Sequence, residues 1–330
     1  MKAILFIVFL FFLSGYSYSQ KDSLAFAMHK NRLVIHTSIS LRDAPFSFKD
    51  DFDGVKKLGY RANLNVIHGF GVAYKWFALN INYKLPGYVR NTEKYGRTKY
   101  FDLGLKFSFK QWYFNVDFHD YIGYGIKKAN TLSDTLPTTT SGYYLNDKIQ
   151  SASFGVNAYH FFNKDLNMKA AVGIVGRYTK PVHGPYIRLT SNIHGVSSNN
   201  GLIPHEYFTS TPSIHKSTSI SAFDFGGIPG YAYLNNIDGW QFGAFAGIGA
   251  VIQAKVYSFE NTQRSFLGIS PRIDLKLQAG YNVENWFLML TSSFDQKNIR
   301  VKSFSYNQLY YYLRLTYGYR FKIKTKNKSK

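Results

Sequence analysis

Apolar and polar side chains alternate every second residue along much of this chain. In one run Leu103 and Leu105 alternate with Asp102 and Lys106, and the apolar positions change parity after a polar pair at 110–111. Successive side chains of a β-strand point to opposite faces, so such a run has one apolar and one polar face. A parity change across two residues is typical of a tight hairpin, because the residues that flank the turn share a face.

The same alternation predicts twelve strands. Their expected ranges are 33–41, 60–74, 77–84, 101–109, 112–118, 149–162, 166–178, 219–234, 239–254, 267–281, 286–296 and 309–323. Five short turns alternate with six longer connections, which span 42–57, 85–97, 125–148, 179–218, 255–266 and 297–304. Transmembrane barrels combine short periplasmic turns with longer external loops, and an even strand number places both termini in the periplasm.

We therefore expect an all-β fold, an antiparallel transmembrane β-barrel of about 12 strands with short periplasmic turns and longer external loops. A soluble β-sandwich would also alternate, but its apolar face would be the inner one and its outer face would not be aromatic. Aromatic residues make up 18% of this chain. After the N-terminus, no segment is apolar over the roughly 20 residues that a helical membrane span needs.

The chain begins with a pattern that is typical of a secretory signal peptide. Lys2 supplies the charged start, Ala3–Leu13 the apolar stretch, and Ser17 and Ser19 the small residues before a cleavage point. The apolar stretch is too short for a membrane-spanning helix, so we expect cleavage rather than anchoring. The predicted organisation is a signal peptide at 1–19, an outer-membrane barrel at 20–323 and a basic tail at 324–330.

The charge of the chain bears on its partners. The formal net charge is +21, and cysteine is absent, which excludes disulfides and thiolate metal sites. An exported basic chain meets anionic lipid before it meets nucleic acid, so we expect outer-membrane lipid and lipopolysaccharide as partners and no nucleic acid. Near the C-terminus, Thr316, Gly318, Phe321 and Ile323 resemble the insertion signal of outer-membrane barrels, which implies contact with the barrel-assembly machinery.

Three stretches carry a family resemblance. They read GFGVAYKWFALNINYKLPG at 69–87, YHFFNKDLNMKAA at 159–171 and GIPGYAYLN at 227–235. Together they resemble an uncharacterised Bacteroidota family that is known only as a domain of unknown function, family 4421. The resemblance covers most of the mature chain and implies an outer-membrane β-barrel. Its motifs are hairpin-turn patterns, so they imply relatives without implying a chemistry.

The polar faces of the predicted strands would line the barrel lumen, where basic residues outnumber acidic ones. The lumen-lining candidates are Arg61, Lys84, Asp102, Lys106, Asp117, His119, Lys169, Arg177, Arg272, Asp274, Lys276, Arg314 and Arg320. One interpretation is a packed charge network that closes a narrow interior, because buried charges must be paired or solvated. The other is a small water-filled passage that favours anions.

One short sequence, HGVSSNNG at 194–201, resembles the His, Ser, Asn and Gly cluster of outer-membrane phospholipases. In those enzymes the His activates a Ser two positions away, whereas position 196 here is Val and Ser198 lies four residues from His194 in a predicted loop. A general base must come within hydrogen-bond reach of its nucleophile. The spacing does not require this, so we predict no catalytic residue.

The sequence predicts neither a metal site nor a cofactor. His194, His205 and His215 fall in one predicted loop, but closed metal sites usually need three or four convergent ligands. We therefore expect a non-enzymatic outer-membrane barrel, which is either a structural or surface-interaction protein or a narrow anion-favouring channel. The alternatives are an outer-membrane phospholipase-like hydrolase and a periplasmic β-rich ligand-binding protein.

Overall fold

The structure is a computed structural model, and it describes residues 25–29, 31–74, 77–126, 129, 132, 138–139, 142–174, 176–204, 213–259 and 262–323. The predicted signal peptide at 1–19 and the predicted tail at 324–330 lie outside these residues and stay predictions. Within the described part of the chain, no helix has the length and apolar character needed to cross a membrane.

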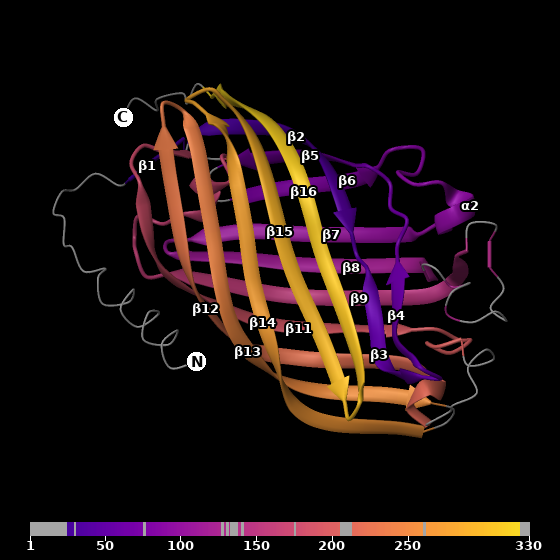
Figure 1. Cartoon of the computed structure of the whole chain (residues 1–330). Coiled ribbons are helices and arrows are strands. Elements are labelled where there is room, and N and C mark those ends of the chain that lie inside the picture. The colour runs from indigo at the N-terminus through magenta and orange to yellow at the C-terminus, as the bar shows by residue number, and fades with distance from the viewer. Residues whose placement is uncertain are drawn as a thin grey trace, which may run out of the picture.

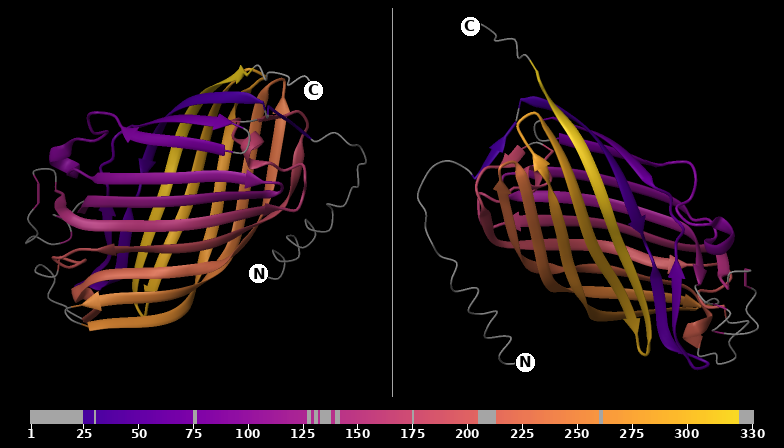
Figure 2. Two further views of the ribbon diagram at one scale, coloured as in Figure 1. Left: turned by 180° about the vertical axis from the view of Figure 1, so that it is seen from behind. Right: turned by 45° about the horizontal axis from the view of Figure 1, so that its top comes forward.

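Twelve antiparallel strands form a closed ring (Figure 1). In chain order they are β2 (Arg32–Asp43), β5 (Ile67–Tyr74), β6 (Phe77–Lys84), β7 (Lys99–Phe109), β8 (Trp112–Ile126), β9 (Tyr144–Phe161), β11 (Val182–Ser197), β12 (Ser217–Ile237), β13 (Trp240–Phe259), β14 (Thr262–Asn282), β15 (Trp286–Val301) and β16 (Phe304–Lys322). Each pairs with the next, and β16 closes the ring by pairing with β2. Figure 2 shows the ring from behind. The predicted antiparallel barrel of about 12 strands is confirmed.

The outer surface of the ring is apolar. On β7, Phe101, Leu103 and Leu105 are 57%, 50% and 43% exposed, while Asp102 and Lys106 face a cavity inside the barrel. The strand pairing around the ring satisfies most of the backbone hydrogen bonds internally, as a bilayer requires. An apolar outer face on a closed ring is the arrangement of a transmembrane barrel.

A hairpin extends the wall at one end of the barrel. β3 (Phe46–Phe52) continues along β16 where β2 ends, and β4 (Val55–Arg61) pairs with β8. The wall therefore runs from β16 through β3 and β4 to β8 at this end, without β6 and β7 (Figure 1). The short helices α2 (Thr92–Tyr95) and η3 (Ser213–Lys216) lie in connections at the same end. The segment 42–57, expected as a loop, is thus largely strand.

The predicted strand at 60–74 is wrong as a single element. β4 ends at Arg61 and β5 begins at Ile67, with an irregular segment between them. Tyr60 is 1% exposed, whereas Phe70, at the same parity, is 47% exposed. Across the irregular segment, the positions that point inward change from even-numbered in β4 to odd-numbered in β5. The sequence conceals this exchange, because Ala62 and Leu64 continue the apolar alternation across the break.

The connection that follows β9 also differs from the prediction. Residues 166–178, expected as a strand, contain the helix α3 (Met168–Ala171) and the strand β10 (Gly176–Tyr178), which pairs with β1 (Phe26–Met28). The barrel strand is β11, which lies inside the predicted 179–218 loop. Its buried face includes Tyr186 and its exposed face includes His183, so the contrast between apolar and polar faces is weak there.

Two further predicted loops, 255–266 and 297–304, are mostly strand. β13 ends at Phe259 and β14 begins at Thr262, and residues 302–303 join β15 to β16. The first six residues of β14 are exposed on both faces although they pair with β13. Strand residues that meet the same surroundings on both faces need not alternate, so the pattern does not mark them as strand.

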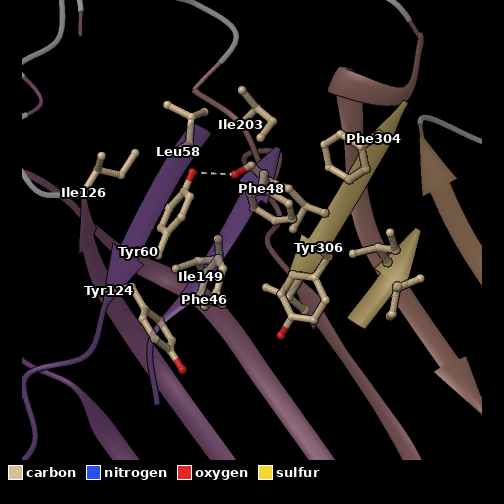
Figure 3. Close-up of a cluster of buried hydrophobic side chains, with 14 of the residues drawn as sticks. Phe46, Phe48, Leu58, Tyr60, Tyr124, Ile126, Ile149, Ile203, Phe304 and Tyr306 are labelled. Carbon is tan, nitrogen blue, oxygen red and sulfur yellow. Dashed lines mark hydrogen bonds between the residues drawn. The ribbon is translucent and has the colours of Figure 1, made fainter. Parts of the chain in front are cut away.

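Apolar side chains fill the interior at the hairpin end. This hairpin-side core is shown in Figure 3, where Tyr60 donates a hydrogen bond of 2.7 Å to the Leu202 carbonyl oxygen. Its members come from strands on opposite sides of the ring, among them β4, β8, β13 and β16. They include Phe46, Phe48, Leu58, Tyr60, Tyr124, Ile126, Ile149, Ile203, Tyr257, Phe304 and Tyr306.

A second apolar assembly fills the opposite end. We call residues 25–29, 162–174 and 176–178, which contain β1, α3 and β10, the plug. On one side of the plug, Phe26 and Met168 belong to a core with Phe245 of the wall. On the other side, Met28 packs against a small core that contains Phe287 of β15. The plug therefore contacts the wall on both sides.

Candidate functional site

A cavity of about 240 Å³ lies between the plug and the hairpin-side core. Its walls include Met168 and Ile174 of the plug and Tyr121 of the hairpin-side core. We call this cavity the central chamber. Its charged lining residues are Arg42, Asp43, Asp102, Lys106, Asp117, Lys169, Arg188, Asp274, Lys276, Asp295 and Arg314.

The lumen-lining candidates fall in different places. The chamber is lined by Asp102, Lys106, Asp117, His119, Lys169, Asp274, Lys276 and Arg314. Arg272 and Arg320 are buried inside the barrel but do not line the chamber, and Arg177 is part of the plug. Lys84 is exposed at the end of β6, with its Nζ 5.1 Å from the centre of the Tyr100 ring. Arg61 is exposed, because the irregular segment after β4 reverses the expected parity.

Asp102 is the centre of one hydrogen-bond network in the chamber. Its carboxylate accepts from Arg42 at 2.5 Å, lies 2.5 Å from Nδ1 of His119, and accepts from the Tyr121 hydroxyl at 3.1 Å. The other ring nitrogen of His119 lies 4.0 Å from Asp117. A carboxylate with three close partners is well stabilised in its charged form. Asp102 therefore holds His119 and Arg42 in place.

Asp274 is the centre of a second network. It accepts hydrogen bonds from Arg188 at 3.0 Å and from the Tyr186 hydroxyl at 2.8 Å. The guanidinium of Arg188 also lies 3.6 Å from Asp295. Lys276 donates to the Tyr159 hydroxyl at 2.6 Å. This side of the chamber is thus a packed network of paired charges.

Two cations in the chamber have neither an ion pair nor a side-chain hydrogen bond among the described residues. Among the described residues, neither Lys106 of β7 nor Arg314 of β16 forms an ion pair. The Nε atom of Arg314 is buried without a hydrogen-bond partner, and its guanidinium carbon lies 5.1 Å from the centre of the Tyr312 ring. A buried cation without a partner is costly unless water or an anion solvates it. These two side chains can bind an anionic group.

Polar side chains of the wall fix the plug in place. Arg320 donates hydrogen bonds to the carbonyl oxygens of Gly173 and Gly176. Gln241 donates to the carbonyl oxygens of Ala170 and Ala171 at 3.0 and 2.6 Å. The alternation pattern predicts that Arg320 points into the barrel. It does not predict the plug, whose carbonyl oxygens Arg320 contacts.

Two ionisable groups in and beside α3 and β1 have shifted pKa values. Burial, with a smaller contribution from nearby Arg320, lowers the pKa of His29 to about 4. Burial also lowers the pKa of Lys169 in α3 to about 8. Both shifts arise because burial disfavours the charged form of a base.

The candidate hydrolytic pair, His194 and Ser198, does not form a hydrogen bond. His194 points into the barrel and lies 2.9 Å from Asp224, which also contacts Arg272 and accepts from Gln253 at 2.7 Å. The hydroxyl of Ser198 is buried and, among the described residues, has no hydrogen-bond partner. His205 lies outside the described residues. The described part of the chain contains no group of three or more residues that could hold a metal ion.

The closed ring and its apolar outer face define an antiparallel transmembrane β-barrel. The chain belongs to a family described as a domain of unknown function, DUF4421, whose profile matches residues 20–321. No curated protein sequence matches the chain.

Several solved structures are similar to the chain at low identity. The outer membrane protease OmpT from Escherichia coli has a TM-score of 0.43 and 9% identity, over 91% of this chain and 99% of that one. The toluene transporter TodX from P. putida has a TM-score of 0.27 and 7% identity, over 89% and 91%. CdiB from Acinetobacter baumannii has a TM-score of 0.31 and 8% identity, over 87% and 60%.

Proposed function

We propose that this protein is a non-enzymatic outer-membrane barrel whose lumen is closed to solute flow and whose central chamber is a binding site. The observation that supports this proposal most directly is that apolar side chains fill the lumen on both sides of the chamber. A polar solute that crossed the barrel would have to leave water twice, since both assemblies are apolar. The closed arrangement favours a binding or structural role over the narrow anion channel that the sequence left open.

The side-chain chemistry of the interior supports binding rather than catalysis. His119 lies between two carboxylates, Asp102 and Asp117, and His194 contacts Asp224. Among the described residues, no serine or threonine hydroxyl forms a hydrogen bond with either imidazole. A hydrolase of the Ser–His type needs that contact, or close approach to it. Lys106 and Arg314 offer instead two cationic groups at a cavity.

Conductance in a planar lipid bilayer tests the closed lumen. We expect folded wild-type protein to give no stepwise ion current, whereas an open porin in the same apparatus gives steady current. Slower gel migration after boiling would verify that the inserted protein was a folded barrel, because a closed ring resists unravelling. Stable, ohmic channels formed by the folded wild type would contradict the proposal.

A further inference from the structure

One seam of the barrel wall is incompletely hydrogen-bonded. β6 and β7 pair only at Phe77 with Phe107, Ala78 with Lys106 and Leu79 with Leu105. The same register, continued, would pair Asn80 with Gly104 and so on to the end of β6, but no further pairing exists. The connection that contains α2 joins the separated ends of the two strands (Figure 1).

This unpaired segment forms a slot with defined limits. The pairing of Leu79 with Leu105 closes one end. At the other end Lys84 reaches across to Tyr100, with its Nζ 5.1 Å from the ring centre. A barrel normally leaves no free strand edge within the bilayer, because each unsatisfied backbone group there costs several kcal/mol. The slot therefore requires polar occupants for its strand edges.

The outer rim of the slot is apolar. Ile81 and Tyr83 of β6 are 60% and 51% exposed, and Phe101 and Leu103 of β7 are exposed to a similar degree. These side chains belong to the outer apolar face of the barrel, which meets lipid chains. A molecule in contact with this rim has an apolar part.

The inner side of the slot opens into the central chamber. Leu79, Asn80, Leu103 and Gly104 line the chamber as well as the slot. A Cβ atom at Gly104 would meet only one atom within 4 Å, the Val116 carbonyl oxygen at 3.9 Å, so this position is unobstructed. Lys106 follows Gly104 on the same face of β7, about 7 Å further along the strand. The slot thus leads directly to an unpaired cation.

We propose that an anionic lipid enters this slot, with its phosphate in the chamber beside Lys106 and Arg314 and its acyl chains outside against Ile81 and Leu103. The inference rests on the closed lumen of the proposed function, which leaves the slot as the route to the chamber. A chamber of about 240 Å³ has room for roughly eight waters, enough for a phosphate-bearing headgroup but not for acyl chains.

Charge balance favours a phosphate over a cationic occupant. Asp102 is paired with Arg42 and Asp274 with Arg188, while Asp117 accepts a hydrogen bond from Asn115 at 2.6 Å and lies 4.0 Å from His119. Lys106 and Arg314 have no such partners among the described residues, and Asn80 adds a buried oxygen without a hydrogen-bond partner. A phosphate oxygen accepts hydrogen bonds from both cations, and a hydroxyl of the headgroup can donate to Asn80.

Native mass spectrometry of the folded protein tests this site. Wild-type protein, extracted in a mild detergent and exposed to equal amounts of phosphatidylglycerol and phosphatidylcholine, should retain one phosphatidylglycerol. We expect the double variant Lys106→Gln, Arg314→Gln to retain it at least tenfold more weakly. Gly104→Leu, which obstructs the slot and keeps both charges, should weaken retention as well. Lys110→Gln, in the exposed turn between β7 and β8, is the control and should retain the lipid as the wild type does.

Several outcomes would overturn the lipid site. Equal retention of the two lipids by the wild type would do so, as would undiminished retention by folded Lys106→Gln, Arg314→Gln protein. Retention of millimolar inorganic phosphate by wild-type protein that retains neither lipid would show that the chamber takes the free anion rather than a lipid. These readouts are separate from ion current, so a conducting barrel that retains the lipid would contradict the closed lumen alone.

Discussion

At the residue scale, the interior charges divide into compensated and uncompensated groups. Asp102 and Asp274 each have a close guanidinium partner, at 2.5 and 3.0 Å. Such pairs hold each other in position, because removal of one member leaves the other buried and unpaired. Lys106 and Arg314 lack this compensation and mark the part of the chamber that is available to a ligand.

His29, between β1 and β2, supplies a pH-dependent stability. The pKa of His29 is about 4 in the folded protein, against 6.5 for an exposed histidine. Between pH 4 and pH 6.5 the unfolded chain therefore binds a proton at His29 more readily than the folded protein does. The free energy of unfolding should therefore fall as the pH is lowered from 6.5 to 4, by on the order of 2 kcal/mol from this residue. His29→Gln should remove this contribution.

Thermal unfolding at pH 7 and pH 4.5, followed by gel migration, measures the difference between the two proteins. We expect the wild type to lose more stability on acidification than His29→Gln. Equal losses would mean that His29 is not held in its neutral form by burial.

At the element scale, the plug depends on the wall for its structure. β1 has 3 residues, α3 has 4 and β10 has 3, and elements of this length are not stable alone. Hydrogen bonds from Arg320 and Gln241, together with apolar packing, hold the plug against the barrel.

Replacement of Arg320 should loosen the plug without opening the ring. Arg320→Met leaves buried carbonyl oxygens of Gly173 and Gly176 without this donor, at about 1–3 kcal/mol for each. We expect trypsin to cut within the plug, at Lys164, Lys169 or Arg177, while the strands of the ring stay intact. Arg300→Met, an exposed arginine on β15, is the control and should keep the wild-type cleavage pattern. A plug that resists trypsin equally in all three proteins would show that Arg320 does not fix it.

The alternation of side chains sufficed to predict the ring but not its interior. Strands such as β7 and β8 meet lipid on one face and a polar chamber on the other, so their sequences alternate clearly. β11 does not, because Tyr186 faces inward and His183 outward. The pattern predicts a strand at 166–178 because the side chains of the plug pack on all sides inside the barrel, and their apolar positions mimic a strand face.

The structure brings some of the lumen-lining candidates to the chamber and places others elsewhere. Asp102, Lys106 and Arg314 lie on strands whose register the pattern defines, and all three line the chamber. Arg61 is exposed rather than inside the lumen, because the change of inward-pointing positions in the irregular segment after β4 does not alter the apolar alternation of the sequence. The slot between β6 and β7 could not be predicted either, since both strands alternate normally where their pairing stops.

At the scale of the whole molecule, the barrel consists of a membrane wall and an interior with three layers. The hairpin-side core, the central chamber and the plug follow one another along the lumen. The two apolar layers make the interior resemble that of a soluble protein, and in the function that we propose they separate the chamber from water at either end. Closure of the chamber is therefore the claim on which both the proposed function and the lipid site depend.

The most direct test of that closure is the reactivity of a single thiol inside the chamber. The chain has no native cysteine, so Ser293→Cys, which places a thiol in the chamber lining, provides the only reactive site. In lipid vesicles, a bulky charged maleimide should label Thr138→Cys, at an exposed position, and should leave Ser293→Cys unlabelled until the protein is unfolded. Labelling of Ser293→Cys in the folded barrel at the rate seen for Thr138→Cys would contradict a closed chamber.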